Sequence, residues 1–258
     1  MPLGRRHALG ALALLAAAPA RADGPPRAIL APTGTLRVAV YPGSPTSLVR
    51  DARTGEARGL SVDLGTEVAR RLGVPVELRS FTRVPEVIAA IAAGEADLTI
   101  SNATPARARE VDFSETVVSL ELGFLVPAAA AARSAAEVDA AGMRIGAVTG
   151  STTERTLPGQ LRAARVVAVA NLGAGRAALA AGELDAFATN KAILFEMSDQ
   201  LPGARVLDGR WGLEHLAFAV PKGRGAALPW LSAFAAEARA SGLLAEAIAR
   251  AGLRGVAG

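Results

Sequence analysis

The chain has 258 residues, 51% of them hydrophobic, so it is long enough to bury one large core or two modest ones. It contains no Cys, which excludes disulfides, thiolate metal sites and a thiol-linked lipid anchor. Aromatic residues make up only 4%, and no basic cluster is interleaved with them, so nothing supports a nucleic-acid-binding groove. Without the three arginines of the first 22 residues, the formal charge of +4 falls nearly to zero, because 25 basic residues then face 24 acidic ones.

Residues 1–22 are predicted to be a secretory signal peptide outside the fold. Arg5 and Arg6 precede an apolar run over 8–18, and the run is followed by Ala20-Arg21-Ala22, a small-x-small cleavage pattern. Two adjacent arginines also occur in ordinary leaders, so we expect the general secretory route rather than twin-arginine export. The apolar run is too short to span a bilayer, and no other stretch approaches the roughly 20 apolar residues required. We therefore expect an exported protein that is soluble after its leader is removed.

The first part of the chain alternates between strand and helix patterns. A β-branched, alternating run predicts a strand over 34–40, and Pro and Gly predict a turn after it. Ser61 is the candidate N-cap of a helix that ends near residue 72. The next expected elements, in order, are a strand over 76–78, a helix over 84–93 and a short buried strand over 96–100.

Polar residues begin where this last strand ends. In a parallel α/β sheet the carboxyl ends of the strands face the ligand crevice. Ser101, Asn102 and Thr104 are therefore candidates for hydrogen-bonding a small molecule, and Arg107 and Arg109 follow within reach. The alternative for the two arginines is an ordinary solvated loop.

The same pattern recurs in the second half of the chain. Residues 177–190 match residues 89–102 at eight of fourteen positions without a gap, including a shared Gly-Glu-x-Asp core. Asn190 would then be the counterpart of Asn102, at the exit of an equivalent strand. Chance agreement in an Ala-rich chain is the alternative, but the shared core favours two lobes built alike.

Between the two repeats, the sequence predicts an extended segment, a connection and the start of a further helix. An apolar, extended segment covers 117–126, an Ala-rich connection and helix covers 128–141, and a strand follows over 143–148. Ser151 and Thr152 then open a helix whose N–H groups and dipole favour an anion. The alternative for Ser151 is an ordinary N-cap in a capping box. A strand over 166–170 and a helical tail from 228, broken at Gly242, complete the expected elements.

Common catalytic patterns are missing. His215 is the only His outside the first 22 residues, so a His cluster is excluded, and there is no Gly-x-Ser-x-Gly or P-loop. Residues 173–178 match a relaxed dinucleotide fingerprint, but the second strand ends in Asn190-Lys191 where the ribose needs an acid. We expect no catalytic residue, no metal site and no cofactor.

Several segments, in this order and spacing, resemble the periplasmic solute-binding proteins of ABC importers, family 3, the polar amino acid type. They cover nearly the whole chain after the leader: LRVAVYPG, GLSVDL, AGEADLTISNATPARAREVDFS, GAVTGSTTE, AAGELDAFATN, FLVP and FAVPKG. The resemblance implies an α/β fold of the two-lobed periplasmic binding protein (type II) class, with two crossing hinge strands. The implied division is a first lobe of 33–124 with 221–258, a second lobe of 128–215, and hinges near 124–127 and 218–221.

The resemblance also implies a ligand site. Arg107 matches the arginine that clamps the ligand carboxylate in the family, and Ser151 and Thr152 match hydroxyls that contact the same group. The chain departs from the family pattern in three places. The loop before Arg107 is shorter, which leaves Arg109 as an alternative; Ser44 replaces the usual stacking aromatic, with Tyr41 nearby; and Asn190 stands where amino-acid binders carry an acid for the ammonium.

The expected function is that of a non-enzymatic periplasmic receptor. It would close on a small carboxylate or amino-acid-like solute and, as a monomer, present it to an inner-membrane ABC permease. Because a neutral Asn190 compensates an ammonium poorly in a closed cleft, we expect a solute other than a standard α-amino acid. The alternatives are a dehydratase-like enzyme on the same scaffold, for which 189–193 offers no carboxylate, and an accessory or sensor module.

Overall fold

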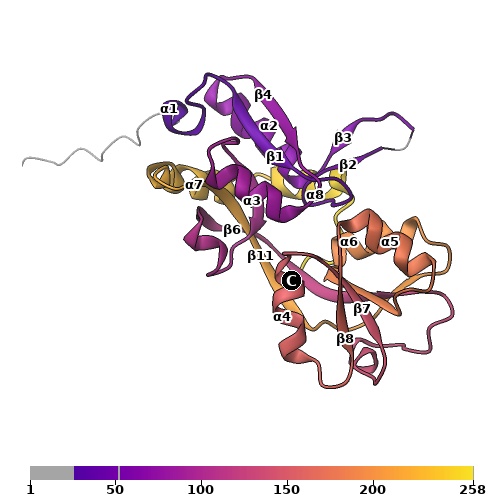
Figure 1. Cartoon of the computed structure of the whole chain (residues 1–258). Helices are drawn as coiled ribbons and strands as arrows, with labels where there is room; N and C mark the ends of the chain where they lie inside the picture. The colour runs from indigo at the N-terminus through magenta and orange to yellow at the C-terminus, as the bar shows by residue number, and fades with distance from the viewer. Residues whose placement is uncertain (1–25, 52, 258) are drawn as a thin grey trace, which may run out of the picture.

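The computed structural model describes residues 26–51 and 53–257. The predicted signal peptide lies outside these residues. The chain forms two α/β lobes joined by two long strands, as Figure 1 shows. No helix in the described ranges combines the length and the apolar character needed to cross a membrane.

The first lobe is built on a mixed sheet with helices on both faces. Its elements are α1 (Arg27–Leu30), β1 (Leu36–Val40), β2 (Val49–Arg50), β3 (Ala57–Arg58), α2 (Leu60–Leu72), β4 (Val76–Ser80), α3 (Val84–Ala92), β5 (Thr99–Asn102), η1 (Arg107–Arg109), η4 (Gly225–Ala227), α7 (Leu228–Ala240) and α8 (Leu243–Ala251). Strands β1 and β4 are parallel, and Val38 bridges in parallel to Leu98 just before β5. Because side chains alternate along β1, Val38 and Val40 belong to the core that includes residues of α2, α7 and α8, whereas Ala39 belongs to the core that includes residues of α3.

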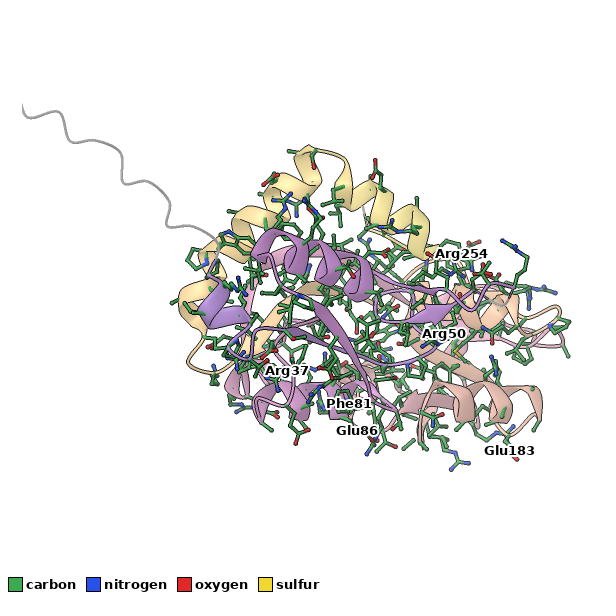
Figure 2. The ribbon with its side chains drawn as sticks, turned by 90° about the horizontal axis from the view of Figure 1, so that it is seen from above. Arg37, Arg50, Phe81, Glu86, Glu183 and Arg254 are labelled. Atoms are coloured by element: carbon green, nitrogen blue, oxygen red, sulfur yellow. The ribbon has the colours of Figure 1, made fainter. Side chains whose placement is uncertain are left out.

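The second lobe repeats this arrangement with fewer residues. Its elements are η2 (Ala135–Val138), β7 (Arg144–Val148), α4 (Thr152–Thr156), η3 (Leu157–Gln160), β8 (Arg165–Val169), α5 (Leu172–Ala180), β9 (Ala186–Asn190), α6 (Lys191–Asp199) and β10 (Arg205–Val206). Strand β7 lies between β8 and β9 and is parallel to both. Figure 2, seen from above, has Arg37 and Phe81 on the first lobe and Glu183 at the far end of the second.

Two antiparallel strands, β6 (Val111–Val126) and β11 (Gly212–Pro221), run through both lobes. In the first lobe β11 pairs with β5, and in the second β6 pairs with β9 and β10. Their mutual register shifts on either side of Ala217, which is where the paired strands are irregular. The carboxyl end of β5 and that of β9 are thereby brought to the same place between the lobes.

The repeated segments form the same structure in each lobe. Both run from a helix, α3 or α5, through a left-handed Gly into a strand, and both Gly residues have φ near 71°. In the first lobe the Arg37 side chain donates to both Asp97 carboxylate oxygens and to the Gly94 carbonyl. In the second, Arg144 makes the corresponding bonds to Asp185 and Gly182. The two lobes are therefore built alike down to individual hydrogen bonds.

Two local predictions were wrong. The segment 128–141 contains only the single 3₁₀ turn η2, because its polar groups are engaged elsewhere: the Asp139 carboxylate accepts from three backbone N–H groups of 162–164. Ser61 is not an N-cap but lies inside α2, and its hydroxyl donates to the Thr46 carbonyl. The N-cap is Gly59, whose φ of 144° an L-residue with a Cβ rarely adopts.

Candidate functional site

A small cavity of about 40 Å³ lies between the lobes, at the carboxyl ends of β5 and β9. Seven of the eight predicted site residues line it: Tyr41, Ser101, Asn102, Arg107, Ser151, Thr152 and Asn190. The eighth, Thr104, does not. The first three residues come from strand ends of the first lobe, and the last three come from helix starts of the second. A molecule held here would touch both lobes at once.

Arg107 is the buried cation of this cavity. It lies on η1 with only 6% of its surface exposed, whereas Arg109 on the same turn is exposed. Its Nη1 donates to the Ser101 hydroxyl at 2.9 Å and to the Asn102 carbonyl at 3.3 Å. No bond from Nε or Nη2 to another described residue is present. Burial lowers the pKa of Arg107, and the nearby Glu214 carboxylate opposes this effect.

The polar residues at the end of β5 and directly after it hold this arginine in place. The Thr104 hydroxyl accepts from the Arg107 backbone N–H at 3.3 Å, so Thr104 is bonded to the turn that carries the guanidinium and does not line the cavity. The Asn102 side-chain oxygen accepts from the His215 N–H at 3.1 Å, which ties β5 to the crossing strand β11. Ser101 and Asn102 are both buried, and both contact the cavity.

In the second lobe, Ser151 and Thr152 have different roles. The Ser151 hydroxyl accepts from the Glu154 N–H at 3.1 Å, so it is the N-cap of α4. The Thr152 Oγ1 is a buried atom with no hydrogen-bond partner among the described residues. A buried polar atom without a partner costs free energy, typically about 1–3 kcal/mol. Because Thr152 lines the cavity, a bound molecule is the natural partner for this hydroxyl.

Asn190 uses both atoms of its amide within the protein. Its oxygen accepts from the Ile193 N–H at 3.1 Å and thereby caps α6. Its Nδ2 donates to Oε2 of Glu214 at 3.0 Å. Asn190 is therefore both a helix cap and the holder of a neighbouring carboxylate.

Glu214 is the site residue that the sequence analysis missed. It lies on β11, is only 8% exposed, and lines the cavity together with Arg107. Burial raises its pKa, while the Asn190 hydrogen bond and the Arg107 charge lower it by less. The sequence does contain a signal for Glu214, because it is an acidic residue next to an apolar run that is predicted to pass between the lobes. The family pattern places the acid at Asn190, on a different strand.

Tyr41 and a set of apolar side chains form the remaining wall. The Tyr41 hydroxyl donates to Ser44 Oγ at 3.3 Å, and burial raises the pKa of Tyr41. A second cavity of about 30 Å³ shares Tyr41 and Thr189 with the first. The apolar residues of the two cavities are Val84, Ile100, Val148, Leu172, Ile193 and Leu216.

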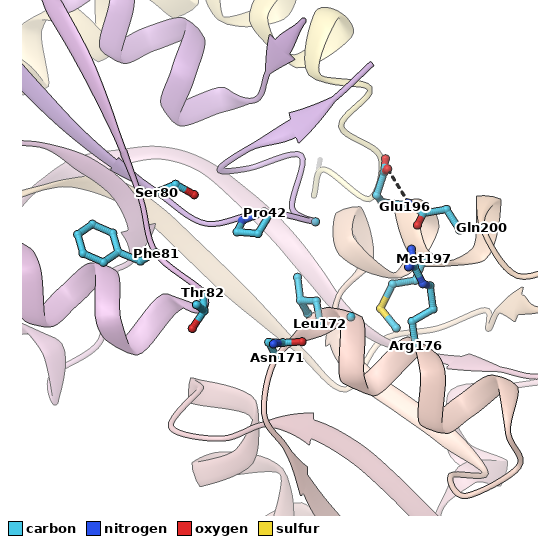
Figure 3. Close-up of a pocket in the computed structure, with 12 residues that line it drawn as sticks. Pro42, Ser80, Phe81, Thr82, Asn171, Leu172, Arg176, Glu196, Met197 and Gln200 are labelled. Carbon is cyan, nitrogen blue, oxygen red and sulfur yellow. Dashed lines mark hydrogen bonds between the residues drawn. The ribbon is translucent and has the colours of Figure 1, made fainter. Parts of the chain in front are cut away.

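A larger hollow of about 460 Å³ opens next to these cavities, and Figure 3 shows its lining. It lies between Pro42 and Thr82 of the first lobe and Leu172 and Arg176 of the second. Thr82 and Leu172 also line the second small cavity, so the three hollows adjoin one another. None of its charged lining residues is buried, and we therefore take the Arg107 cavity as the candidate site.

The site combines one buried cation, one buried carboxylate and several hydroxyls and amides. This set can hold a small polar molecule through hydrogen bonds from both lobes. The described residues contain no group of three or more His, Cys, Asp or Glu that could hold a metal ion.

Comparison with known proteins gives a family match over most of the chain. The family described as "Bacterial extracellular solute-binding proteins, family 3" matches residues 36–252. The ABC transporter glutamine-binding protein GlnH of Bacillus subtilis (strain 168) is 27% identical over 191 residues. That stretch covers 69% of this chain and 66% of the relative, just under two thirds of its length.

Solved structures with the same fold include "An ancestral arginine-binding protein bound to glutamine", at 25% identity and a TM-score of 0.73. The superposition covers 83% of this chain and 96% of that one. The ancestral amino acid-binding protein AncCDT-1, a precursor of cyclohexadienyl dehydratase, is 23% identical with a TM-score of 0.74, covering 86% and 97% of the two chains. The predicted two-lobed fold class is confirmed.

Proposed function

Because the chain belongs to family 3 of the bacterial extracellular solute-binding proteins, we propose that it is a receptor for a small solute that carries a carboxylate. The solute would lie in the Arg107 cavity and be carried to an ABC permease in the inner membrane. Export by the predicted signal peptide would deliver the receptor to the periplasm. The related GlnH is named as an ABC transporter binding protein, which supports this partner.

The observation that carries the proposal is that Arg107 is buried while part of its guanidinium lacks a hydrogen-bond partner among the described residues. The guanidinium is buried between the lobes, and two of its three nitrogens make no bond to another described residue. A buried guanidinium presents a planar fork of donors that matches a carboxylate. The Thr152 hydroxyl on the opposite lobe, which has no partner within the described part of the chain, supports the same location.

We propose that the lobes close on the solute by bending the two crossing strands. The predicted division puts the hinges near 124–127 and 218–221, at the ends of β6 and β11. The register irregularity around Ala217 makes the middle of the strands a second place where bending would disturb few hydrogen bonds. Hinge residues in either place would change solute affinity without touching the solute.

A thermal-shift screen tests the proposal. The protein without its leader would be screened against amino acids, dicarboxylates, keto acids and phosphonates. We expect one class to raise the melting temperature, since a ligand of the folded state stabilises it. Arg107→Ala should weaken that binding by about 30-fold or more, because a charge-assisted contact in a closed cleft is lost.

The matched control for this screen is Arg109→Ala. Arg109 lies on the same 3₁₀ turn but is exposed, so its removal should leave binding within about twofold. Binding that survives Arg107→Ala, or that is lost in Arg109→Ala, would show that the anchor is misplaced. A screen in which no compound shifts the melting temperature would refute the receptor.

A second candidate is an enzyme on the same scaffold. The expectation that the cleft lacks a carboxylate holds for 189–193 but not for the whole cavity, because Glu214 faces it. A buried carboxyl with a raised pKa is suited to act as a general acid. Incubation with prephenate discriminates the two: a receptor leaves prephenate unchanged, whereas a dehydratase converts it and loses this activity in Glu214→Gln. An accessory or sensor module, the remaining alternative, would bind solute without a permease partner.

A further inference from the structure

We propose that residues 253–257, the segment that follows α8, form a third link between the lobes and restrain their separation when no solute is bound. The segment leaves the first lobe, bonds to the middle of β6 and contacts helix α6 of the second lobe. In Figure 2, Arg254 is labelled where the yellow end of the chain meets the second lobe. This inference goes beyond the receptor function, because it concerns a movement of the protein that needs no solute.

The first contact is with the part of β6 that lies between the lobes. The Glu121 N–H donates to the Gly255 carbonyl at 2.9 Å, and the Ala257 N–H donates to the Ser119 carbonyl at 2.9 Å. Strand β11 occupies one edge of β6 here, so the segment bonds to the edge that β11 leaves free. Strand β9 of the second lobe pairs with β6 directly beyond it, over 122–125. The segment therefore reaches the second lobe along the crossing strand.

The second contact is with one face of α6. Lys191, Phe195 and Asp199 are spaced four residues apart, so they lie one above another over about 12 Å of the helix. The Arg254 guanidinium lies 4.7 Å from the centre of the Phe195 ring and donates to both Asp199 carboxylate oxygens. Gly255 packs against the first turn, because a Cβ there would overlap the Lys191 Cβ. Contacts at both ends of the face restrict tilting of the helix more than a single contact would.

The segment has no spare length. Leu253 is 6% exposed and belongs to the core of the first lobe, together with Leu244 and Ala251 of α8. Only one residue separates Leu253 from Gly255, so their Cα atoms can be at most about 7 Å apart. If α6 moved away from the first lobe, either the contacts of Arg254 and Gly255 or the packing of Leu253 would be lost.

Helix α6 also carries part of the candidate site. Asn190 is its N-cap and Ile193 lies in its first turn, and both line the Arg107 cavity. A link that holds α6 against the first lobe keeps these residues opposite Arg107 before a solute arrives. Apparent affinity scales with the population of the binding-competent arrangement, so such a link would favour binding.

The rival explanation is that α6 and the segment lie at the pivot of the movement and stay together. Their contacts would then persist when the lobes part, and removing them would leave the separation unchanged. The two explanations differ in the distance between the lobes of the solute-free protein.

Double electron–electron resonance between spin labels on the two lobes is the test. The chain contains no Cys, so Glu95→Cys and Glu183→Cys introduce two unique labelling sites, both at exposed, equivalent positions of the repeats. The labelled protein would be unfolded and refolded to remove any solute. We expect one dominant distance, with a longer-distance population at least about threefold larger in Arg254→Ala, which loses an ion pair and a cation–π contact. Gly255→Ala, whose Cβ displaces the segment from α6, should shift the distribution in the same direction.

Two variants within the first lobe are the matched controls. Arg250→Ala removes a cation of α8 that pairs with Asp63 at 3.1 Å inside this lobe. Gly242→Ala imposes left-handed backbone strain at φ 86°, where no described atom lies within 4 Å of the new Cβ. Both should leave the distance distribution unchanged. If Arg254→Ala does not fold, Asp199→Asn weakens the same ion pair from the second lobe and should shift the distribution in the same direction.

The outcomes decide between the restraint and the pivot. An unchanged distribution in either Arg254→Ala or Gly255→Ala would overturn the restraint, and so would a broad range of distances before any tail residue is changed. A shift in Arg250→Ala as large as that in Arg254→Ala would overturn it too, because the effect would not depend on α6. Since no solute is present, none of these results depends on the receptor function, which the thermal-shift screen tests separately.

Discussion

Asp97 is the carboxylate whose loss we expect to be most damaging to the fold. Its side chain is fully buried and accepts from Arg37 at 2.6 Å and from Arg224 at 2.7 Å. Asp97→Asn would leave two partly buried guanidinium groups without their shared anion, so we expect a loss of about 3–5 kcal/mol in the free energy of unfolding. Urea denaturation measures this loss.

Asp185 provides the matched comparison for this residue. It makes the corresponding bonds to Arg144, but both side chains are 34% exposed. We expect Asp185→Asn to cost about 1 kcal/mol or less, because water screens an exposed pair. Equal losses for the two substitutions would show that burial does not set the strength of this repeated interaction.

Asp97 should also set the lowest pH at which the fold is stable. Burial raises the pKa of Asp97, but the hydrogen bonds from Arg37 and Arg224 outweigh this effect and hold the pKa below its ordinary value. A lowered folded-state pKa means that the stabilisation is present above the unfolded value and is lost as the pH falls through the folded one. Melting temperatures measured from neutral pH into the range below about 4 should fall steeply for the wild type and less for Asp97→Asn. Parallel curves for the two proteins would contradict this assignment.

At the scale of elements, the start of α2 depends on a glycine that the sequence did not identify. Gly59 has φ 144°, and a Cβ there would lie 2.4 Å from the Ser47 carbonyl oxygen, a backbone atom that cannot rotate away. Gly59→Ala should therefore destabilise the protein by about 3 kcal/mol or more. Gly73→Ala, at the other end of the helix with φ 65° and open space around it, should cost about 1 kcal/mol. Thermal unfolding of both variants provides the comparison.

Elements with a strong internal pattern could be predicted from the sequence, and those fixed by distant partners could not. The repeat around Asp97 and Asp185 predicted two equivalent helix–strand units, and both occur with the same hydrogen bonds. The helix expected over 128–141 is almost absent, because Asp139 bonds to a loop more than twenty residues away. Ala-rich composition favours a helix, but tertiary contacts decided this segment.

At the scale of the whole molecule, most of the residues that line the cavity could be predicted from the sequence, because the family pattern indicates which residues lie at the ends of strands. Sequence reasoning missed Glu214 because the register of β11 against β5 and β6, which decides which of its residues reach the cavity, cannot be read from the sequence. It assigned Thr104 to the cavity because a hydroxyl three residues before Arg107 can either accept from the Arg107 N–H or contact a ligand, and the sequence does not decide between the two. Contacts between segments about a hundred residues apart are not visible in local patterns.

Closure of the lobes around a solute should make the whole molecule more compact. If β6 and β11 bend as hinges, a saturating solute should reduce the radius of gyration measured by small-angle X-ray scattering. Arg107→Ala at the same solute concentration should keep the value of the free protein, because the solute no longer bridges the lobes. An unchanged radius for a wild-type protein with bound solute would mean that binding occurs without closure.

The central claim is that Arg107 anchors a solute between the lobes, and one calorimetric titration tests it most directly. The best compound of the thermal-shift screen would be titrated into the wild type and into Arg107→Ala, both unfolded and refolded to remove any solute carried through purification. We expect one binding site in the wild type and an affinity about 30-fold or more lower in the variant. Equal affinities in the two proteins would contradict it.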